Sequence, residues 1–166
     1  MRKVALTSAA VALLLGLAGV VSIAAASQAA EPSTAKSKTL TFDVVFSPFS
    51  LVATNNVRDP NSPIALGDEI TFHDQLFAEG KQVGDTVGSC VVASVTPETL
   101  ASCSAVFRLQ GGNIAAQFVA IPGPTPKDVA LTGGTGSYRN VGGAGTLVEF
   151  GNGNGRLTLH VLRFAP

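Results

Sequence analysis

The chain is poor in aromatic, charged and metal-binding side chains. Its 166 residues include no tryptophan, one tyrosine and two histidines, and the 13% that are charged sum to a formal net charge of zero. The basic residues are scattered rather than clustered, which argues against a nucleic acid or an anionic membrane as partner. Two histidines without clustered carboxylates also argue against a zinc site. The sequence therefore predicts neither a metal nor another cofactor.

The first thirty residues have the layout of a secretory signal peptide. Arg2-Lys3 precede an apolar run (4–23) and a stretch of small residues (24–30). This pattern predicts cleavage after Ala29, with Ala26 as the alternative, and an uncleaved anchor helix is the competing interpretation. No cysteine follows the run, which excludes a lipoprotein anchor. We expect a secreted protein without membrane contact after cleavage, divided into a signal peptide (1–29), a flexible linker (30–38) and one domain (39–166).

Short segments that alternate apolar and polar residues fill the rest of the chain, and no long segment has helical periodicity. The predicted strands cover residues 40–46, 49–54, 70–77, 87–95, 102–109, 113–121, 128–131, 143–150 and 155–164. Turns rich in glycine, proline and asparagine separate them. Eight or so strands linked by hairpins predict an all-β fold, either an antiparallel barrel or a sandwich.

A glycine-rich stretch, residues 131–145, is the most distinctive part of the chain. It holds six glycines, but it lacks both the G-x-G-x-x-G spacing and the lysine of phosphate-binding loops. We interpret it as a corner between strands, where glycine supplies positive φ and lets two backbones approach closely. Such corners favour a closed barrel, and closure removes exposed strand edges. An eight-stranded barrel either fills its interior or encloses one small ligand.

Cys90 and Cys103 are the only cysteines and flank a turn between two predicted strands. Export favours a disulfide between them. A bond that closes a loop of this size would stabilise the fold by about 3 kcal/mol. The alternative is a free, reactive Cys90 thiolate beside a cation.

Several landmarks follow the order seen in plant allene oxide cyclases and in dirigent proteins. They are Leu66-Gly67-Asp68, Phe72-His73-Asp74-Gln75-Leu76-Phe77, Val83-Gly84, Gly88-Ser89-Cys90-Val91 and the glycine corner, continued as Tyr138-Arg139. The chain resembles these families from about residue 66 to residue 161, as an exported, bacterial-type relative. The resemblance implies an eight-stranded antiparallel β-barrel of the calycin type and, as often in these families, a homotrimer.

The resemblance also implies candidate catalytic residues. Asp74 and Arg139 match an aspartate and an arginine of the dirigent proteins, and Asp128 precedes the corner at an acidic position. Asp43 aligns with the first-strand carboxylate of the cyclases, and Cys90 aligns with a cysteine of their cavity. In an apolar cavity, desolvation would raise the pKa of Asp74 and make it a general acid, while a nearby arginine could hold an oxyanion.

Each candidate also has a structural interpretation. Asp74 could bond a turn, Arg139 could bond carbonyls or pair with Asp128, and Asp43 could face solvent. His73 alternates away from Asp74 in a regular strand, so we expect it outside the barrel. The cavity tyrosine of the cyclases and the second arginine of the dirigent proteins have no counterpart at residues 119–121 and at Gly142.

Phenylalanines on the predicted strands are the candidate ligand-binding residues, because they suit aromatic or lipid guests, although they could equally form ordinary core. They are Phe42, Phe72, Phe107 and Phe118. Two hypotheses follow. The first is an isomerase-type barrel that binds a small apolar or phenolic molecule and steers its cyclisation or coupling. The second is a non-catalytic small-molecule binder or a structural secreted barrel.

Overall fold

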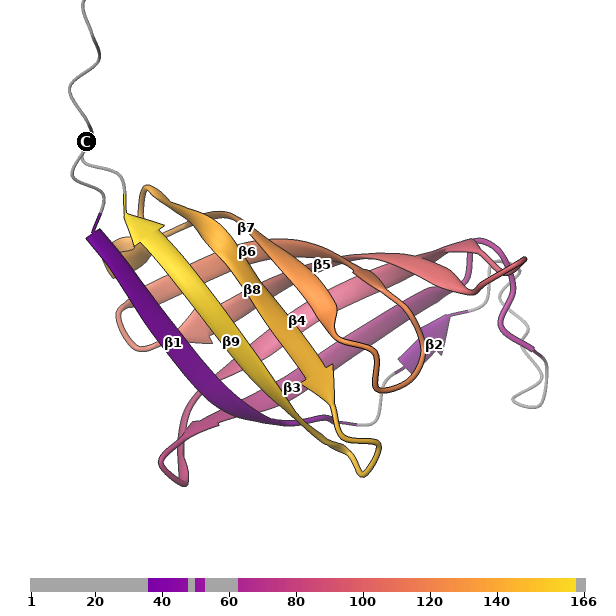
Figure 1. Cartoon of the computed structure of the whole chain (residues 1–166), viewed down its shortest axis with the longest axis horizontal. Helices are drawn as coiled ribbons and strands as arrows, with labels where there is room; N and C mark the ends of the chain where they lie inside the picture. Colours follow the sequence, from indigo (N-terminus) through magenta and orange to yellow (C-terminus); the bar gives the residue numbers. More distant parts are fainter. Residues whose placement is uncertain (1–35, 48–49, 53–62, 164–166) are drawn as a thin grey trace, which may run out of the picture. The chain divides into compact units, whose positions relative to one another are not determined.

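The structure is a computed structural model that describes residues 36–47, 50–52 and 63–163. These residues form nine β-strands and one 3₁₀ turn (Figure 1). The predicted signal peptide and most of the linker lie outside the described residues. The elements are β1 (Lys36–Val45), β2 (Ser50–Val52), β3 (Glu69–Ala78), β4 (Lys81–Ser94), β5 (Leu100–Leu109), β6 (Gly112–Ala120), β7 (Lys127–Gly134), η1 (Gly136–Tyr138), β8 (Val141–Glu149) and β9 (Asn154–Arg163).

Eight of the strands close into an antiparallel barrel. Neighbours pair in the order β1-β9-β8-β7-β6-β5-β4-β3, and β1 also pairs with β3, which closes the ring. The closing pair is short, because only residues 43–45 of β1 face residues 75–77 of β3. β2 pairs with residues 69–71 of β3 and so extends the same edge of that strand. The predicted all-β barrel is therefore confirmed.

Alternation along the strands creates the interior. Every second side chain points inward, and the inward positions carry mostly aliphatic and phenylalanine side chains. Their burial stabilises the barrel by roughly 1.5–3 kcal/mol for each large side chain. The buried core consists of Phe42, Val44, Leu76, Phe107, Ile114, Ala116, Val129, Leu131, Val141, Leu157, Leu159 and Val161.

β4 differs most from its prediction, because it starts at Lys81 rather than at residue 87. Gly84 and Asp85 are poor strand formers, and so the local sequence before residue 87 does not predict a strand. β4 nevertheless pairs with β3 from Lys81 and also with β5 from Gly84 onward. Pairing on both sides outweighs the weak propensity of its residues.

The glycine stretch forms a corner between strands, as interpreted from the sequence. β7 runs on to Gly134, and η1 then turns the chain before β8. Gly136 has a φ of +57°, and a side chain at Gly134 would overlap the carbonyl oxygens of Asn113 and Tyr138. Both positions therefore require glycine. The described residues include no apolar helix of the length that a membrane span needs.

Candidate functional site

One end of the barrel contains a cavity of about 390 Å³. Its walls are mainly aliphatic and aromatic, and three of its lining residues, all in the described part of the chain, are charged. The lining side chains come from β3 (Ile70, Phe72, Asp74), β4 (Cys90, Val92), β5 (Ala101), β6 (Phe118, Ala120), β7 (Lys127) and β8 (Leu147, Glu149), with Phe46, Ser47, Ile64, Thr99, Ile121 and Pro122 from the connections.

Asp74 is the carboxylate that strand alternation turns into the barrel. On β3 it lies between Phe72 and Leu76 on the inward face, and only 6% of the residue is exposed. The backbone N–H of Ser47 donates a hydrogen bond to Oδ1 at 3.1 Å. Burial raises the pKa of Asp74 to about 6, against the lowering effects of the Ser47 hydrogen bond and of His73, while the charge of Glu149 raises it further.

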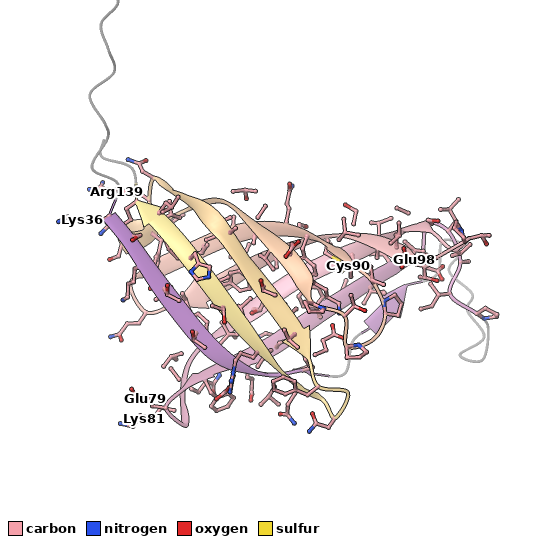
Figure 2. All side chains as sticks on the ribbon, viewed as in Figure 1. Lys36, Glu79, Lys81, Cys90, Glu98 and Arg139 are labelled. Atoms are coloured by element: carbon pink, nitrogen blue, oxygen red, sulfur yellow. A yellow bond between two sulfur atoms is a disulfide. The ribbon has the colours of Figure 1, made fainter. Side chains whose placement is uncertain are left out.

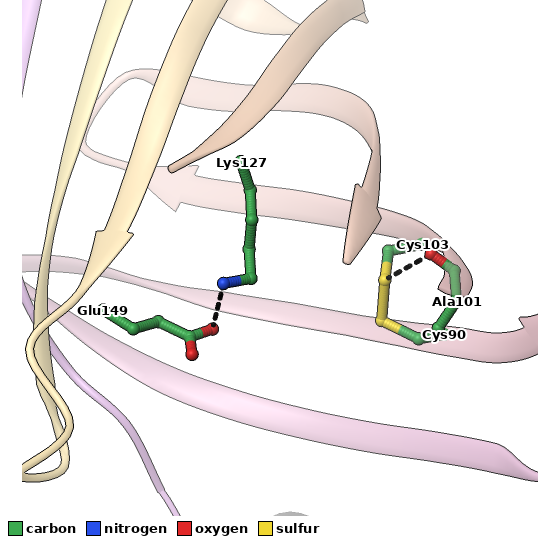
Figure 3. The surroundings of a disulfide bond; sticks show 5 residues. All are labelled: Cys90, Ala101, Cys103, Lys127 and Glu149. Atoms are coloured by element: carbon green, nitrogen blue, oxygen red, sulfur yellow. Dashed lines mark hydrogen bonds and ion pairs between the residues drawn. A yellow bond between two sulfur atoms is a disulfide. The ribbon is translucent and has the colours of Figure 1, made fainter. Parts of the chain in front are cut away.

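Lys127 and Glu149 form an ion pair at the same cavity. Lys127 Nζ lies 3.3 Å from Glu149 Oε1, and the lysine side chain is 3% exposed whereas the glutamate side chain is 35% exposed (Figure 3). The same ammonium donates hydrogen bonds to the carbonyls of Gly123 and Thr125. Glu149 connects this group to Asp74, because its charge contributes to the raised pKa of Asp74.

The site residues predicted from the sequence do not include Lys127 or Glu149, although a period-two signal exists for both. Lys127 alternates in phase with Val129 and Leu131, which are buried, and Glu149 alternates in phase with Leu147, which lines the cavity. Charged residues at strand ends are usually exposed, and for this reason neither residue was predicted to face the cavity.

The predicted disulfide between Cys90 and Cys103 is present. The two residues face each other on β4 and β5 with Cα atoms 4.0 Å apart. The bond excludes a reactive Cys90 thiolate in this oxidised form. Cys90 lines the cavity, and so the disulfide (Figure 3) joins two strands of the cavity wall. A disulfide fits an extracellular protein.

The four predicted ligand-binding phenylalanines lie at different depths. Phe72 and Phe118 line the main cavity. Both also line a smaller space of about 20 Å³, which Phe107 and Asp74 border as well. Phe42 belongs to the buried core. Three of the four phenylalanines thus border a space that Asp74 also borders.

The other predicted catalytic residues lie away from the cavity. Asp43 is exposed on the outer face of β1, where its carboxylate accepts hydrogen bonds from Arg156. Asp128 is exposed, because it alternates with the inward Lys127. Arg139 is exposed after η1, at the end of the barrel away from Cys90 and Glu98 (Figure 2). Their catalytic roles stay predictions.

Neither histidine lies at the cavity. His73 is on the outer face, with Nε2 3.3 Å from Asp85 Oδ2, and His160 bonds Thr39 on the outer surface. Within residues 36–47, 50–52 and 63–163, no three His, Cys, Asp or Glu side chains come together as metal ligands.

Comparisons with known proteins agree with this barrel. A pyocyanin demethylase superposes with a TM-score of 0.65 at 30% identity, over 75% of this chain and 99% of that one. A pterocarpan synthase dirigent protein gives 0.60 at 21% identity, over 80% and 87%. The Diels–Alderase from Streptomyces koyangensis gives 0.57 at 14% identity, over 77% and 65%. The last two likenesses concern the fold alone.

A search of curated proteins by sequence returned no match. The sequence profile described as "Allene oxide cyclase barrel like domain" matches residues 50–155. This range covers well over half of the chain and contains the cavity strands from β3 to β8. The protein therefore belongs to the allene oxide cyclase barrel-like family.

Proposed function

We propose that the protein binds a small apolar or phenolic molecule in this cavity and transfers a proton on it through Asp74, so that the reaction is a cyclisation or another isomerisation. The observation that carries the proposal is a single buried carboxyl, with a raised pKa, in a cavity with aromatic walls. A proton taken from one position of the ligand and returned at another leaves its composition unchanged. The reaction then needs no co-reactant.

The cavity suits a small aromatic guest. Its volume of about 390 Å³ lies within the range of about 300–1,000 Å³ that is common for ligand pockets. Phe72 and Phe118 offer ring faces and edges, and Ile70 and Leu147 add apolar surface. Aromatic side chains bind flat guests by stacking and by edge contacts.

The protonation of Asp74 suits proton transfer at neutral pH. A carboxyl with a pKa of about 6 is ionised in about ten of eleven molecules at pH 7, and so it can accept a proton first. Its conjugate acid is strong enough to return that proton. General acid–base catalysis is most effective when the pKa lies near the working pH.

The names of the structural relatives support a small-molecule reaction. One relative is a demethylase of pyocyanin, one is a pterocarpan synthase and one is a Diels–Alderase. All three names describe proteins that act on small organic molecules. The names of these relatives thus agree with a small organic molecule as the guest of the cavity.

The test compares wild type with Asp74→Asn, and Glu69→Gln on the outer face of the same strand is the matched control. Binding is measured with the neutral fluorophore N-phenyl-1-naphthylamine. Proton transfer is measured by NMR as deuterium incorporation from D₂O into any guest that co-purifies and is identified by native mass spectrometry. We expect Asp74→Asn to bind the fluorophore and to lose exchange by at least about a hundredfold, which is the usual contribution of a general acid–base group. A wild type that binds no fluorophore and carries no guest would refute the proposal.

The alternative is a binder without catalysis. The exposure of Arg139 favours it, because Asp74 then lacks the arginine partner that the resemblance implied. The same experiment separates the two. A guest that binds wild type and Asp74→Asn equally, without exchange in either, would establish the binder.

We also propose export through the signal peptide at residues 1–29, supported by the sequence pattern and by the disulfide. Mass spectrometry of protein from a culture supernatant should find an N-terminus at Ala30 and a mass two hydrogens below that of the dithiol form. A homotrimer remains a prediction from the resemblance, and the same spectrum reports it.

A further inference from the structure

Lys127 is a buried cation with no part in the proton transfer proposed above. It opens β7 and points inward with Val129, and 3% of its side chain is exposed. Removing an ammonium from water is unfavourable unless hydrogen bonds and an opposite charge replace the water. Its position beside an apolar cavity therefore calls for specific partners.

The three N–H groups of the ammonium have three partners. Nζ lies 2.9 Å from the carbonyl oxygen of Gly123, 3.2 Å from that of Thr125 and 3.3 Å from Glu149 Oε1. The ammonium thus has its full set of acceptors without any ligand. No N–H is left to donate to a guest, and so Lys127 orders the cavity through the groups that it holds.

Those groups adjoin or belong to one wall of the cavity. The two carbonyls belong to the connection between β6 and β7, whose first residues, Ile121 and Pro122, line the cavity together with Glu149. Three of the five residues at positions 122–126 are prolines, which have no N–H to hold the backbone. The hydrogen bonds from Lys127 to the Gly123 and Thr125 carbonyls help to hold this backbone in place.

We propose that Lys127 is a positioning residue that holds the β6–β7 connection and the Glu149 carboxylate together as one wall of the cavity. The inference deepens the proposed function, on which it rests. Lys127 balances the charge of Glu149, and Glu149 is one of the groups that act on Asp74, with His73 and the Ser47 N–H. Lys127 therefore influences both the shape of the cavity and the protonation of its carboxyl.

The test uses Lys127→Met, with Lys81→Met as control, because Lys81 is exposed at the β3–β4 hairpin (Figure 2). We expect Lys127→Met to bind N-phenyl-1-naphthylamine about tenfold more weakly, a loss equivalent to about 1.4 kcal/mol. We also expect the NMR titration midpoint of the Asp74 carboxyl to rise, because the charge of Glu149 loses its counter-ion. The double variant Lys127→Met/Glu149→Gln should bring that midpoint below the wild-type value.

A folded Lys127→Met protein with wild-type affinity and a wild-type Asp74 midpoint would overturn the inference. If Lys127→Met does not fold, Glu149→Gln decides, because it breaks the ion pair at a partly exposed residue. The inference then requires weaker fluorophore binding and a lower Asp74 midpoint, and an unchanged affinity contradicts it. If wild type binds no fluorophore, that result counts against the proposed function alone. The inference about Lys127 is still tested by the titration midpoint of Asp74, compared between wild type and Lys127→Met.

Discussion

At the scale of single residues, the burial of Asp74 destabilises the folded protein whenever its carboxyl is ionised. Its carboxyl ionises at about 6 in the folded protein, compared with an ordinary value of 3.8. Between these values the folded protein binds more protons than the unfolded chain. Stability therefore falls as the pH rises from about 4 to about 6 and is then constant as far as this group is concerned. An uncharged side chain at this position would avoid the loss.

We therefore expect Asp74→Asn to be more stable than wild type at pH 8. The gap between 3.8 and about 6 corresponds to about 3 kcal/mol at 1.4 kcal/mol per pH unit. Because the carboxyl borders the cavity and is therefore partly screened, we expect a gain of about 1–2 kcal/mol. Asparagine keeps an oxygen that can accept the Ser47 hydrogen bond. Urea unfolding of both proteins from pH 3.5 to pH 8 measures the difference.

The difference should shrink to a few tenths of a kcal/mol at pH 3.5, where Asp74 is protonated in the folded state and, with its ordinary pKa of 3.8, in about two thirds of the unfolded chains. Glu69→Gln, on the exposed face of the same strand, should show no such pH-dependent gain. A variant that is less stable than wild type by the same amount at every pH would show that Asp74 serves the fold, not the reaction.

At the scale of the elements, the pairing of β3 with β4 shapes the cavity wall. Gly88 on β4 faces Phe72 on β3 across the pair. A methyl group at Gly88 would overlap the Phe72 ring and the Ser104 carbonyl oxygen. The carbonyl belongs to a ladder between central strands and cannot yield easily, so the ring must tilt toward the cavity that it lines. The absence of a side chain at Gly88 thus leaves room for the ring in its present place.

Gly88→Ala should therefore affect stability and binding together. Overpacking of this kind costs about 1–3 kcal/mol in the free energy of unfolding. Displacement of Phe72 should weaken N-phenyl-1-naphthylamine binding about tenfold, equivalent to about 1.4 kcal/mol. Chemical unfolding and fluorescence titration measure the two effects. Ser104→Ala, exposed on β5, is the control, and a Gly88→Ala protein with wild-type affinity would contradict this account of the ring.

The elements also show how far the sequence predicts this protein. Alternation and the glycine corner predict the barrel, because both follow from local backbone geometry. The start of β4 could not be predicted, since its residues are poor strand formers and its partners on β5 are distant in sequence, although its partners on β3 belong to the adjacent hairpin. Similarly, alternation places Asp74 inside, whereas the resemblance that suggested Arg139 carries no information on side-chain direction.

Lys127 and Glu149 illustrate the same limit at the site. Alternation indicates that both point inward, but the free energy of burying a charge makes that interpretation unattractive without a known partner. The partner comes from another strand, and the two carbonyls come from a proline-rich connection. Only the assembled barrel brings these groups together.

At the scale of the whole molecule, the disulfide acts on the unfolded chain as well as on the barrel. It joins residues separated by 13 positions, and a closed loop of this size restricts the unfolded chain by about 3 kcal/mol in free energy. The barrel itself contains long-range strand pairs whose formation costs entropy, such as the three-residue pairing of β1 with β3. A restricted unfolded state offsets part of the entropy that this closure costs.

The double variant Cys90→Ala/Cys103→Ala should accordingly lose about 2–3 kcal/mol in the free energy of unfolding. Its barrel should remain folded, because the two strands keep their ladder on both sides of the bond. Urea unfolding with and without reductant is the measurement. Reductant should bring wild type down to the level of the variant and should leave the variant unchanged. Equal stability of the variant and of oxidised wild type would mean that the bond does not stabilise the molecule. The disulfide would then serve the cavity wall alone.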